Sequence, residues 1–395
     1  MSQVIKAAAE AQHPLLQGKV MDWFPLLPRT RPAGQALHLR IDEIRGLACS
    51  ASHGPDQVRL SSAAQALNKA ALIASDCGLV DLARQLCWRQ FDIFQAATPL
   101  TAKTAKLALQ PIVNLGRLAT RGGDGTRAYR IFENAYTAVR TQTATEIDGR
   151  DIDFRHFVSQ TQERHELRKF LWTILLADGT RALTKAGRWG DALRHLEQHK
   201  GIGKRMLDGR QVAILARCTT GDHDGALDIL DDSSTPDPWE HAVATCLRTL
   251  CLRISNQPAD TSAAAMVRAY LRLEPSPEHI LFRTRLGLCA IDLGVTDLAA
   301  DAHRAGTSPI IARVIREAVA SADTYSASDV LSHQLCHSNM AQADEDALAD
   351  IVEMSGLRRA TMPANLLADL MTSETTSEAQ LAQVLARGTH YPSTA

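Results

Sequence analysis

The chain lacks several features that would identify its class at once. Only 5% of its 395 residues are aromatic, and runs that alternate Val, Ile, Thr and aromatic residues are hard to find, which argues against a sheet fold. No uncharged apolar run approaches the roughly 18 residues that a membrane span needs. Apolar residues make up 45% of the chain and recur regularly, so disorder is excluded for most of its length. We expect a folded protein without a membrane span.

Neither sign of charge is in excess. The chain has 43 basic and 44 acidic residues and a formal net charge of −1, so nothing indicates binding to nucleic acid. Residues 1–16 lack the continuous apolar core of a signal peptide. The eight cysteines are scattered, mostly within apolar helical patterns, which is typical of reduced, buried thiols. These features together predict a cytoplasmic protein.

Motifs of strong catalytic or metal-binding specificity are also missing. The sequence has no P-loop, no dinucleotide-binding glycine motif and no nucleophile elbow. His195 and His199 are one helical turn apart, but no third ligand is assured, so we interpret them as part of a solvated helix face. The His333–His337 cluster does not match a known zinc spacing. We expect no cofactor and no metal.

Alanine, leucine and arginine, which favour helices, dominate the composition. Between amphipathic segments a glycine is followed five residues later by an alanine. A glycine can end one helix in a left-handed conformation, and a small alanine lets the next helix pack closely against it. This pattern predicts helix pairs at Gly78 and Ala83, Gly123 and Ala128, Gly187 and Ala192, Gly221 and Ala226, and Gly294 and Ala299.

The pattern resembles the tetratricopeptide repeat family. Gly187 and Gly221 are 34 residues apart, which is the period of that repeat, and a degenerate unit lies near Pro258. The best unit matches the small and large packing positions of the family in order, at Leu115, Gly116, Ala119, Gly123, Ala128, Phe132 and Ala135. The resemblance covers roughly residues 61–310, and no unit has the complete signature.

The resemblance implies an all-α fold, a right-handed α-solenoid of antiparallel helix pairs with helical caps at both ends. We predict an N-terminal helical cap in residues 1–60, with Trp23, Phe24, Leu26 and Leu27 packed on the first helix pair. Repeats then fill residues 61–310, with an insertion at about 142–166, and C-terminal helices fill 311–370. Residues 371–395 are predicted as a partly disordered tail with a short helix at Glu378–Arg387.

In this family the first helix of each pair lines the concave face and receives an extended peptide. Asn can bind a peptide backbone, while Arg and Lys can bind carboxylates or phosphates. The alternative is that such residues are ordinary solvated positions. Projecting the family register onto the chain places the following residues on the inner surface: Asn68, Lys69, Asn114, Arg117, Arg121, Arg181, Lys185 and Arg285.

Three functions are consistent with this pattern. The first is a scaffold or regulatory module that binds a protein or peptide in its groove. The second is a regulator that senses a small molecule, although no DNA-binding helix-turn-helix is evident. The third is an enzyme or enzyme subunit, for which Arg155, His156 and His165 would have to line a closed cavity. Homodimerisation through a terminal helix pair is a further hypothesis, because a solenoid end exposes apolar surface unless it is capped.

Overall fold

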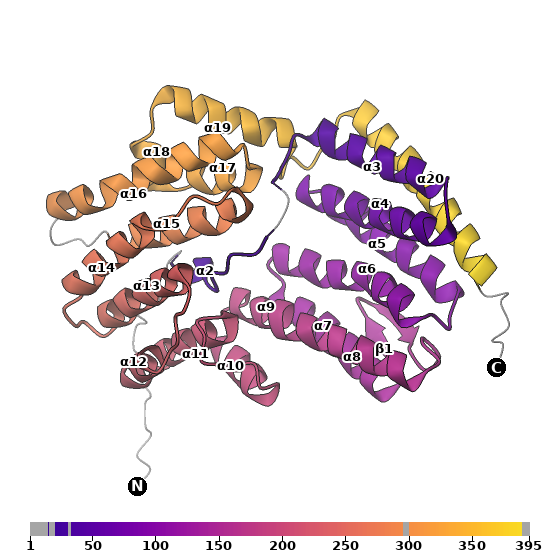
Figure 1. Cartoon of the computed structure of the whole chain (residues 1–395), viewed down its shortest axis with the longest axis horizontal. Coiled ribbons are helices and arrows are strands. Elements are labelled where there is room, and N and C mark those ends of the chain that lie inside the picture. Colours follow the sequence, from indigo (N-terminus) through magenta and orange to yellow (C-terminus); the bar gives the residue numbers. More distant parts are fainter. Residues whose placement is uncertain (1–14, 16–19, 31–32, 295–299, 389–395) are drawn as a thin grey trace, which may run out of the picture. The chain divides into compact units, whose positions relative to one another are not determined.

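The chain is almost entirely helical. The computed structural model describes residue 15 and residues 20–30, 33–294 and 300–388, without the side chains of 300–306 and 388. Helix accounts for 74% of the protein, and the strands in the described ranges form one two-stranded hairpin (Figure 1). The predicted all-α class is confirmed. No helix in these ranges is both long and apolar enough to cross a bilayer.

The described residues form two compact units. Unit 1 comprises those of Met1–Pro32, Trp189–Ser321 and Asp329–Asp344, and unit 2 comprises those of Ala33–Arg188, Ala322–Ser328 and Glu345–Ala395. This division differs from the four consecutive segments expected from the sequence. Each unit contains pieces from distant parts of the chain, because each chain end packs on helices far from it in sequence.

Unit 2 holds most of the N-terminal half of the chain and the last helix. Its elements are α3 (Leu37–Ala51), α4 (Asp56–Asp76), α5 (Val80–Ala96), α6 (Ala102–Arg121), α7 (Gly125–Thr141), β1 (Ala144–Ile147), β2 (Arg150–Asp153), α8 (Thr161–Ile174), the π-helical turn η1 (Leu175–Gly179), α9 (Thr180–Lys185) and α20 (Ala364–Gly388).

Unit 1 holds the middle of the chain. Its elements are α2 (Val20–Trp23), α10 (Trp189–Gln198), α11 (Asp208–Thr219), α12 (His223–Asp231), α13 (Pro238–Ile254), α14 (Asp260–Leu271), the 3-10 turn η2 (Pro277–His279), α15 (Ile280–Gly294), α16 (Ala300–Ser321) and α18 (Gln334–Ser338). Two helices, α17 (Thr324–Leu331) and α19 (Gln342–Ser355), cross the boundary between the units.

Within each unit, consecutive helices pack as antiparallel neighbours, and the first helix of a pair also contacts the first helix of the next pair. In unit 2, α4 contacts α5 and α6, and α6 contacts α7, α8 and α9. In unit 1, α11 contacts α12 and α13, and α13 contacts α14 and α15. The first helices of successive pairs therefore lie side by side in one layer of each unit. Packed helix pairs are thus present in both units.

The predicted turns between paired helices are present at four of five positions. Gly78, Gly123, Gly187 and Gly221 each follow a helix with positive φ, and the alanines five residues later are buried at Ala83, Ala128, Ala192 and Ala226. At the fifth position Gly294 is the last residue of α15, and a Cβ atom there would lie against Thr307 of α16. Ala299 lies outside the described residues.

Close packing explains the glycine inside α6. A Cβ atom on Gly116 would overlap the ring of Phe132, which α7 places against it. Gly287 in α15 has the same role in unit 1, because its Cβ would lie 2.6 Å from the hydroxyl oxygen of Tyr270. In both units a glycine in a first helix thus makes room for an aromatic ring of the neighbouring helix.

The N-terminal segment does not cap the first helix pair. Trp23 donates its indole N–H to Asp292 of α15, with 2.8 Å between Nε1 and Oδ2, and α2 packs on α15. Phe24 and Leu26 are buried within the same unit. The expectation that Trp23 and Phe24 pack on the first pair is therefore wrong. The proline-broken segment covers α11 and α15 of unit 1 instead.

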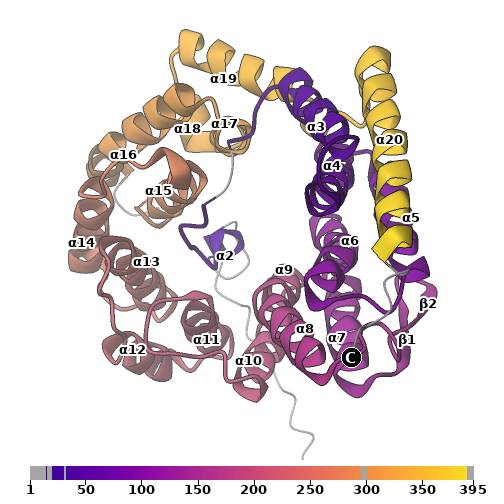
Figure 2. The same cartoon turned by 45° about the vertical axis from the view of Figure 1, so that its right-hand side comes forward.

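The C-terminal region also differs from its prediction. Residues 364–388 form one continuous helix, α20, whereas a Ser/Thr-rich stretch followed by a short helix was expected from residue 371 onward. The hydroxyls of Thr372, Ser373 and Ser377 donate to carbonyls one turn earlier, which satisfies them within the helix. The expected tail at 389–395 lies outside the described residues. Figure 2 shows α20 beside α3, α4 and α5, and it contacts all three.

The insertion at 142–166 contains the β-hairpin. Its strands pair antiparallel through a two-residue turn at Asp148 and Gly149, both with positive φ, as a tight hairpin turn requires. The buried Asp148 carboxylate accepts hydrogen bonds from Arg84 of α5, at 2.7 Å from Nε, and from Arg127 of α7. The turn is therefore tied to two helices, and the insertion is a docked part of unit 2.

Candidate functional site

Seven of the eight predicted site residues lie on three helices of unit 2. Of these helices α4 and α6 are in contact, as are α6 and α9, so they form a continuous surface that we call the α4–α6–α9 face. The eighth residue, Arg285, belongs to α15 of unit 1 and forms an ion pair with Asp329, with 2.8 Å between Nε and Oδ2. The structure therefore places seven of the predicted residues on one face of unit 2 and Arg285 in unit 1.

Two asparagine amides meet on this face. The Nδ2 group of Asn114 donates to Oδ1 of Asn68 at 2.6 Å, and only 6% of Asn114 is exposed. Each amide has one donor group and one acceptor. The bond between them uses one donor and one acceptor, so the pair retains an NH₂ group and a carbonyl oxygen without a further partner among the described residues.

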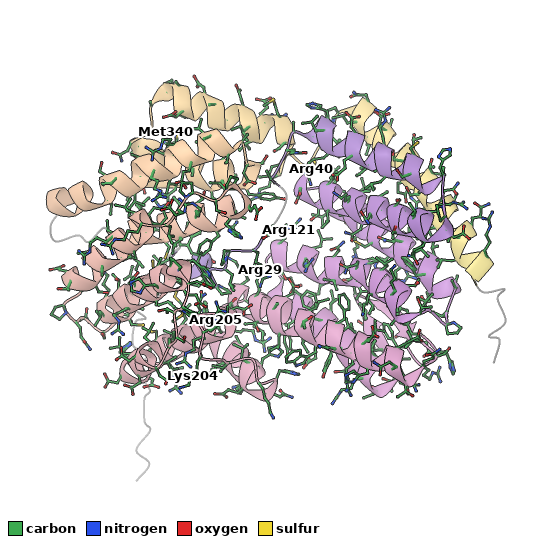
Figure 3. The ribbon with its side chains drawn as sticks, in the orientation of Figure 1. Arg29, Arg40, Arg121, Lys204, Arg205 and Met340 are labelled. Atoms are coloured by element: carbon green, nitrogen blue, oxygen red, sulfur yellow. The ribbon has the colours of Figure 1, made fainter. Side chains whose placement is uncertain are left out.

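An ion-pair cluster lies at the C-terminal end of α4. The Asp76 carboxylate, 5% exposed as a residue, lies 2.6 Å from Nη2 of Arg40 and 3.1 Å from Nη1 of Arg121; both arginines are labelled in Figure 3. Burial and the neighbouring Asp76 carboxylate raise the pKa of the Tyr325 hydroxyl, which also hydrogen-bonds to Asp76. Two guanidinium groups share one carboxylate, so the cluster has an excess of positive charge.

The other predicted cations are already paired. Arg117 forms a two-pronged ion pair with Asp178, at 3.2 Å and 2.9 Å, and Lys69 lies 2.6 Å from Glu43. A carboxylate of the chain itself thus pairs with each of three cations that were predicted to bind a partner, Lys69, Arg117 and Arg121. These ion pairs connect adjacent helices of the stack.

The partner of Arg117 lies in a distorted part of a helix. Asp178 is in the π-helical turn η1, between α8 and α9. Such turns often occur at functional sites because they shift side chains out of the regular helical register. Arg181 and Lys185 follow on α9, four residues apart, so these two share one side of that helix.

The face has little depth. A cavity of about 10 Å³, lined by Ser75 of α4, Cys87 of α5 and Asn114 of α6 among others, has room for about one water molecule. Any ligand on this face would therefore lie along the helices, in contact with the side chains themselves. An extended chain fits such a surface better than a compact small molecule does.

In unit 1 an extended segment of the chain lies on the equivalent helices. The buried Gln211 side chain of α11 accepts a hydrogen bond from the Leu26 N–H and donates one to the Leu26 carbonyl, both at 2.8 Å. Arg29, labelled in Figure 3, forms an ion pair with Asp208 of the same helix at 3.2 Å. One side-chain amide thus satisfies both backbone groups of an extended residue.

The amides of the two units share a sequence register. Gln211 precedes its turn glycine, Gly221, by ten residues, and Asn68 precedes Gly78 by the same number. Both residues therefore occupy the same position on the first helix of a pair, about two turns before its last residue. The sequence analysis identified Asn68 from the repeat register but missed Gln211, although the same register includes it.

Other candidate clusters do not form sites. His195 is buried, with its ring centroid 4.7 Å from that of His199, so the expectation of a solvated face is wrong for His195. Arg155 pairs with Asp153, whose pKa it lowers to about 2, and His165 is exposed on α8. Arg155, His156 and His165 line neither the small cavity on the α4–α6–α9 face nor a larger one beside the first turn of α20. Within the described ranges no three His, Cys, Asp or Glu side chains converge as metal ligands.

The His333–His337 cluster is structural. His333 is the N-cap of α18, because its Nδ1 accepts from the Cys336 N–H, and its Nε2 lies 2.9 Å from Asp292. Seven of the eight free thiols are buried, and Cys49 is exposed. Burial raises the pKa of Cys87 and Cys336 to about 12, which leaves both as unreactive thiols.

Comparison with known proteins yields no match: no family model, no curated protein and no solved structure is similar to this chain.

Proposed function

We propose that this protein is a peptide-binding scaffold whose α4–α6–α9 face binds an extended segment of a partner protein. The helix pairs would be units of a right-handed, tetratricopeptide-like solenoid. The observation that carries the proposal is the Leu26 backbone held by Gln211 in unit 1. It provides an example, within the same chain, of an extended segment bound by a side-chain amide on a first helix.

The asparagine pair supplies the matching chemistry in unit 2. The donor and the acceptor left by the bond between Asn68 and Asn114 complement the C=O and N–H groups of an extended peptide. This complementarity holds whichever way the two amides are oriented, because one group of each kind always remains. Backbone recognition of this kind gives affinity without dependence on partner sequence.

Electrostatics indicates the chemistry of the partner. The shared carboxylate of Asp76 leaves positive charge on Arg40 and Arg121. A carboxylate on the bound segment, from an acidic side chain or the chain end, would be attracted to this region. We therefore expect acidic, extended peptides to bind best.

The double variant Asn68→Ala/Asn114→Ala tests the proposal. A random peptide library is selected on the purified protein, and the affinity of a selected peptide is measured by fluorescence anisotropy. Two lost hydrogen bonds, each contributing about 0.5–1.5 kcal/mol, should weaken binding roughly tenfold. Asn134→Ala is the control, because Asn134 donates to Glu146 of the hairpin, away from the α4–α6–α9 face. Equal affinities for the wild type and the double variant would refute the assignment.

A further inference from the structure

Two pairs of buried thiols connect the first helices of unit 1. Cys218 of α11 and Cys251 of α13 are in hydrogen-bonding contact, with 3.1 Å between their Sγ atoms. Cys246, five residues before Cys251 on α13, hydrogen-bonds to Cys289 of α15. Because α11 contacts α13 and α13 contacts α15, each thiol pair bridges two neighbouring helices.

The Cys218–Cys251 pair is close to the geometry of a disulfide. A disulfide bond is about 2.05 Å long, so the two sulfur atoms would have to approach each other by about 1 Å. Small rotations about the two Cα–Cβ bonds can supply a movement of this size. The two helices can therefore be cross-linked here without a change in their packing.

Cys218 and Cys251 lie near the ends of their helices. Cys218 is the last residue but one of α11, and Cys251 precedes the last residue of α13 by three. The turns that follow are exposed at residues 220–222 and 256–258. Both thiols are buried, so an oxidant reaches them when a helix end opens. Helix ends open locally at a much lower free energy than the middle of a packed helix does.

The second thiol pair lies deeper in unit 1. Cys246 precedes the last residue of α13 by eight residues, which is more than two helical turns. Cys289 lies within residues 286–291 of α15, all of which are buried. Exposure of this pair requires disruption of the core of unit 1. We therefore expect it to stay reduced while the unit is folded.

We propose that Cys218 and Cys251 form a redox modification site, at which hydrogen peroxide oxidises the folded protein to a disulfide. The site belongs to unit 1 and is independent of the binding proposed for the α4–α6–α9 face of unit 2. The class of oxidant is a small peroxide, because an opened helix end admits a small molecule more readily than a protein.

The reaction starts at Cys218, because its hydrogen bond with Cys251, and then burial, raise the pKa of Cys251 and keep the proton on that thiol. The Cys218 sulfur attacks one peroxide oxygen, the O–O bond breaks, and the leaving hydroxide takes up the Cys218 proton as water. The Cys251 sulfur then attacks the sulfur of the resulting sulfenic acid. The S–O bond breaks, and the leaving hydroxide takes up the Cys251 proton. Two thiols are thus oxidised to one disulfide, and one peroxide is reduced to two waters.

The disulfide should stabilise unit 1. Cys218 and Cys251 are 33 residues apart, and a bond between them restricts the unfolded chain more than the folded one. We expect the midpoint of thermal unfolding of unit 1 to rise by about 5–10 °C on oxidation. Unit 2 should unfold at the same temperature as before.

The test begins with the reduced full chain. The folded protein is treated with hydrogen peroxide, and the remaining thiols are then alkylated in denaturant. Peptide mass spectrometry with fragmentation shows which cysteines are linked and which are alkylated. We expect a Cys218–Cys251 disulfide, with Cys246 and Cys289 alkylated. Loss of alkylation at Cys49, which is exposed, reports that the peroxide has acted.

Two matched variants connect the disulfide to the rise in unfolding temperature. Cys251→Ala removes one sulfur of the pair, so peroxide should no longer raise the unfolding temperature of unit 1. Cys246→Ala removes a buried thiol of the same helix that belongs to the second pair, and the rise should be retained. Dithiothreitol should return the oxidised wild type to its original unfolding temperature.

Three results would overturn the proposal. The first is the absence of a Cys218–Cys251 disulfide after peroxide treatment that fully oxidises Cys49. The second is oxidation of Cys246 and Cys289 at the same rate, which would contradict access through the helix ends. The third is an equal rise in unfolding temperature in Cys251→Ala. Peptide mapping of the wild type decides the first two results even if a variant does not fold.

Discussion

The two units are closed by opposite ends of the chain. Unit 1, formed mainly from residues after 189, is covered by the N-terminal segment through Trp23 and Leu26. Unit 2, formed mainly from residues 33–188, is covered by the C-terminal helix α20. The two segments cover different surfaces: α20 packs on α3, α4 and α5, whereas the N-terminal segment lies on α11 and α15, which are first helices of their pairs. In this protein the covering segment comes from the distant end of the chain in both cases.

The comparison also concerns what lies on the first helices. In unit 1 an extended segment already lies on α11, with its backbone bonded to Gln211. In unit 2 the corresponding asparagine has an amide partner, Asn114, and no such segment within the described ranges. The same register position therefore has an internal structural role in one unit and a proposed external binding role in the other.

Removal of α20 should cause the largest difference in stability between the two units. A chain that ends at Pro363 loses four buried aliphatic side chains, Leu370, Leu381, Val384 and Leu385, from the core of unit 2. Each such loss costs about 2–5 kcal/mol, and a typical domain has only about 5–15 kcal/mol of stability. We expect unit 2 to unfold while unit 1 stays folded.

Hydrogen exchange measured by mass spectrometry separates the two units. Peptides from α4 and α5 should lose protection in the shortened chain, whereas those from α13 and α15 should keep it. A chain that ends after Gly388 is the control, because it retains α20. Retained protection in α4 and α5 would show that unit 2 folds without α20. The statement that α20 closes unit 2 would then be wrong.

A change of pH should also act on unit 2 through α20. Glu374 is fully buried, one turn from Glu378 and 3.2 Å from Arg89 of α5. Burial, and then hydrogen bonding and repulsion by Glu378, raise the pKa of Glu374 from 4.5 to about 8, against the opposing effect of Arg89. On α4, packed against the same helix, Arg59 faces Gln380 and Gln383.

The folded form therefore keeps this proton at pH values where the unfolded chain has lost it. The free energy by which the protonated Glu374 carboxyl stabilises unit 2 is complete below about pH 4.5 and is lost as the pH rises towards 8. The loss is about 1.4 kcal/mol for each pH unit of that interval. Glu374→Gln should remove this dependence in denaturant unfolding of unit 2 and leave unit 1 unchanged. An identical pH dependence in wild type and variant would contradict the assignment.

A smaller effect is expected from the two packed glycines. Gly116→Ala forces a methyl group against the ring of Phe132 in unit 2, and Gly287→Ala forces one against Val314 and the Tyr270 side chain in unit 1. Overpacking of this kind typically costs about 1–3 kcal/mol. If the units share one packing rule, the two variants should destabilise their own units by similar amounts in chemical denaturation.

Gly46→Ala is the matched control for these variants. Gly46 lies inside α3, and a Cβ atom there would meet no atom within 4 Å. Alanine favours a helix over glycine by about 0.5–1 kcal/mol, so this variant should be slightly more stable than the wild type. A loss of stability comparable to that of Gly116→Ala would show that the ring contacts are not the cause.

The sequence predicted those residues of the candidate site that depend on the repeat register, and it did not predict those that depend on contacts with distant parts of the chain. The repeat register identified Asn68 and Asn114, which meet as neighbours on adjacent first helices. It missed Arg40, which reaches Asp76 from α3, outside the recognised repeats. It also missed Asp178, whose position depends on a π-helical turn without a clear sequence signal. The Asp-Gly pair at 148–149 was a hairpin signal that the sequence analysis did not use.

Local sequence was sufficient for the helix pairs themselves. The turn glycines such as Gly78 and the alanines such as Ala83 act through sterics within a few residues, so their effect can be inferred without knowledge of the rest of the chain. Only the tertiary structure decided which segment covers each stack and which carboxylate pairs with each arginine. Any amphipathic segment can cover an apolar face, and any nearby carboxylate can pair with a guanidinium group. These choices therefore depend on distances between residues far apart in sequence, which no local pattern encodes.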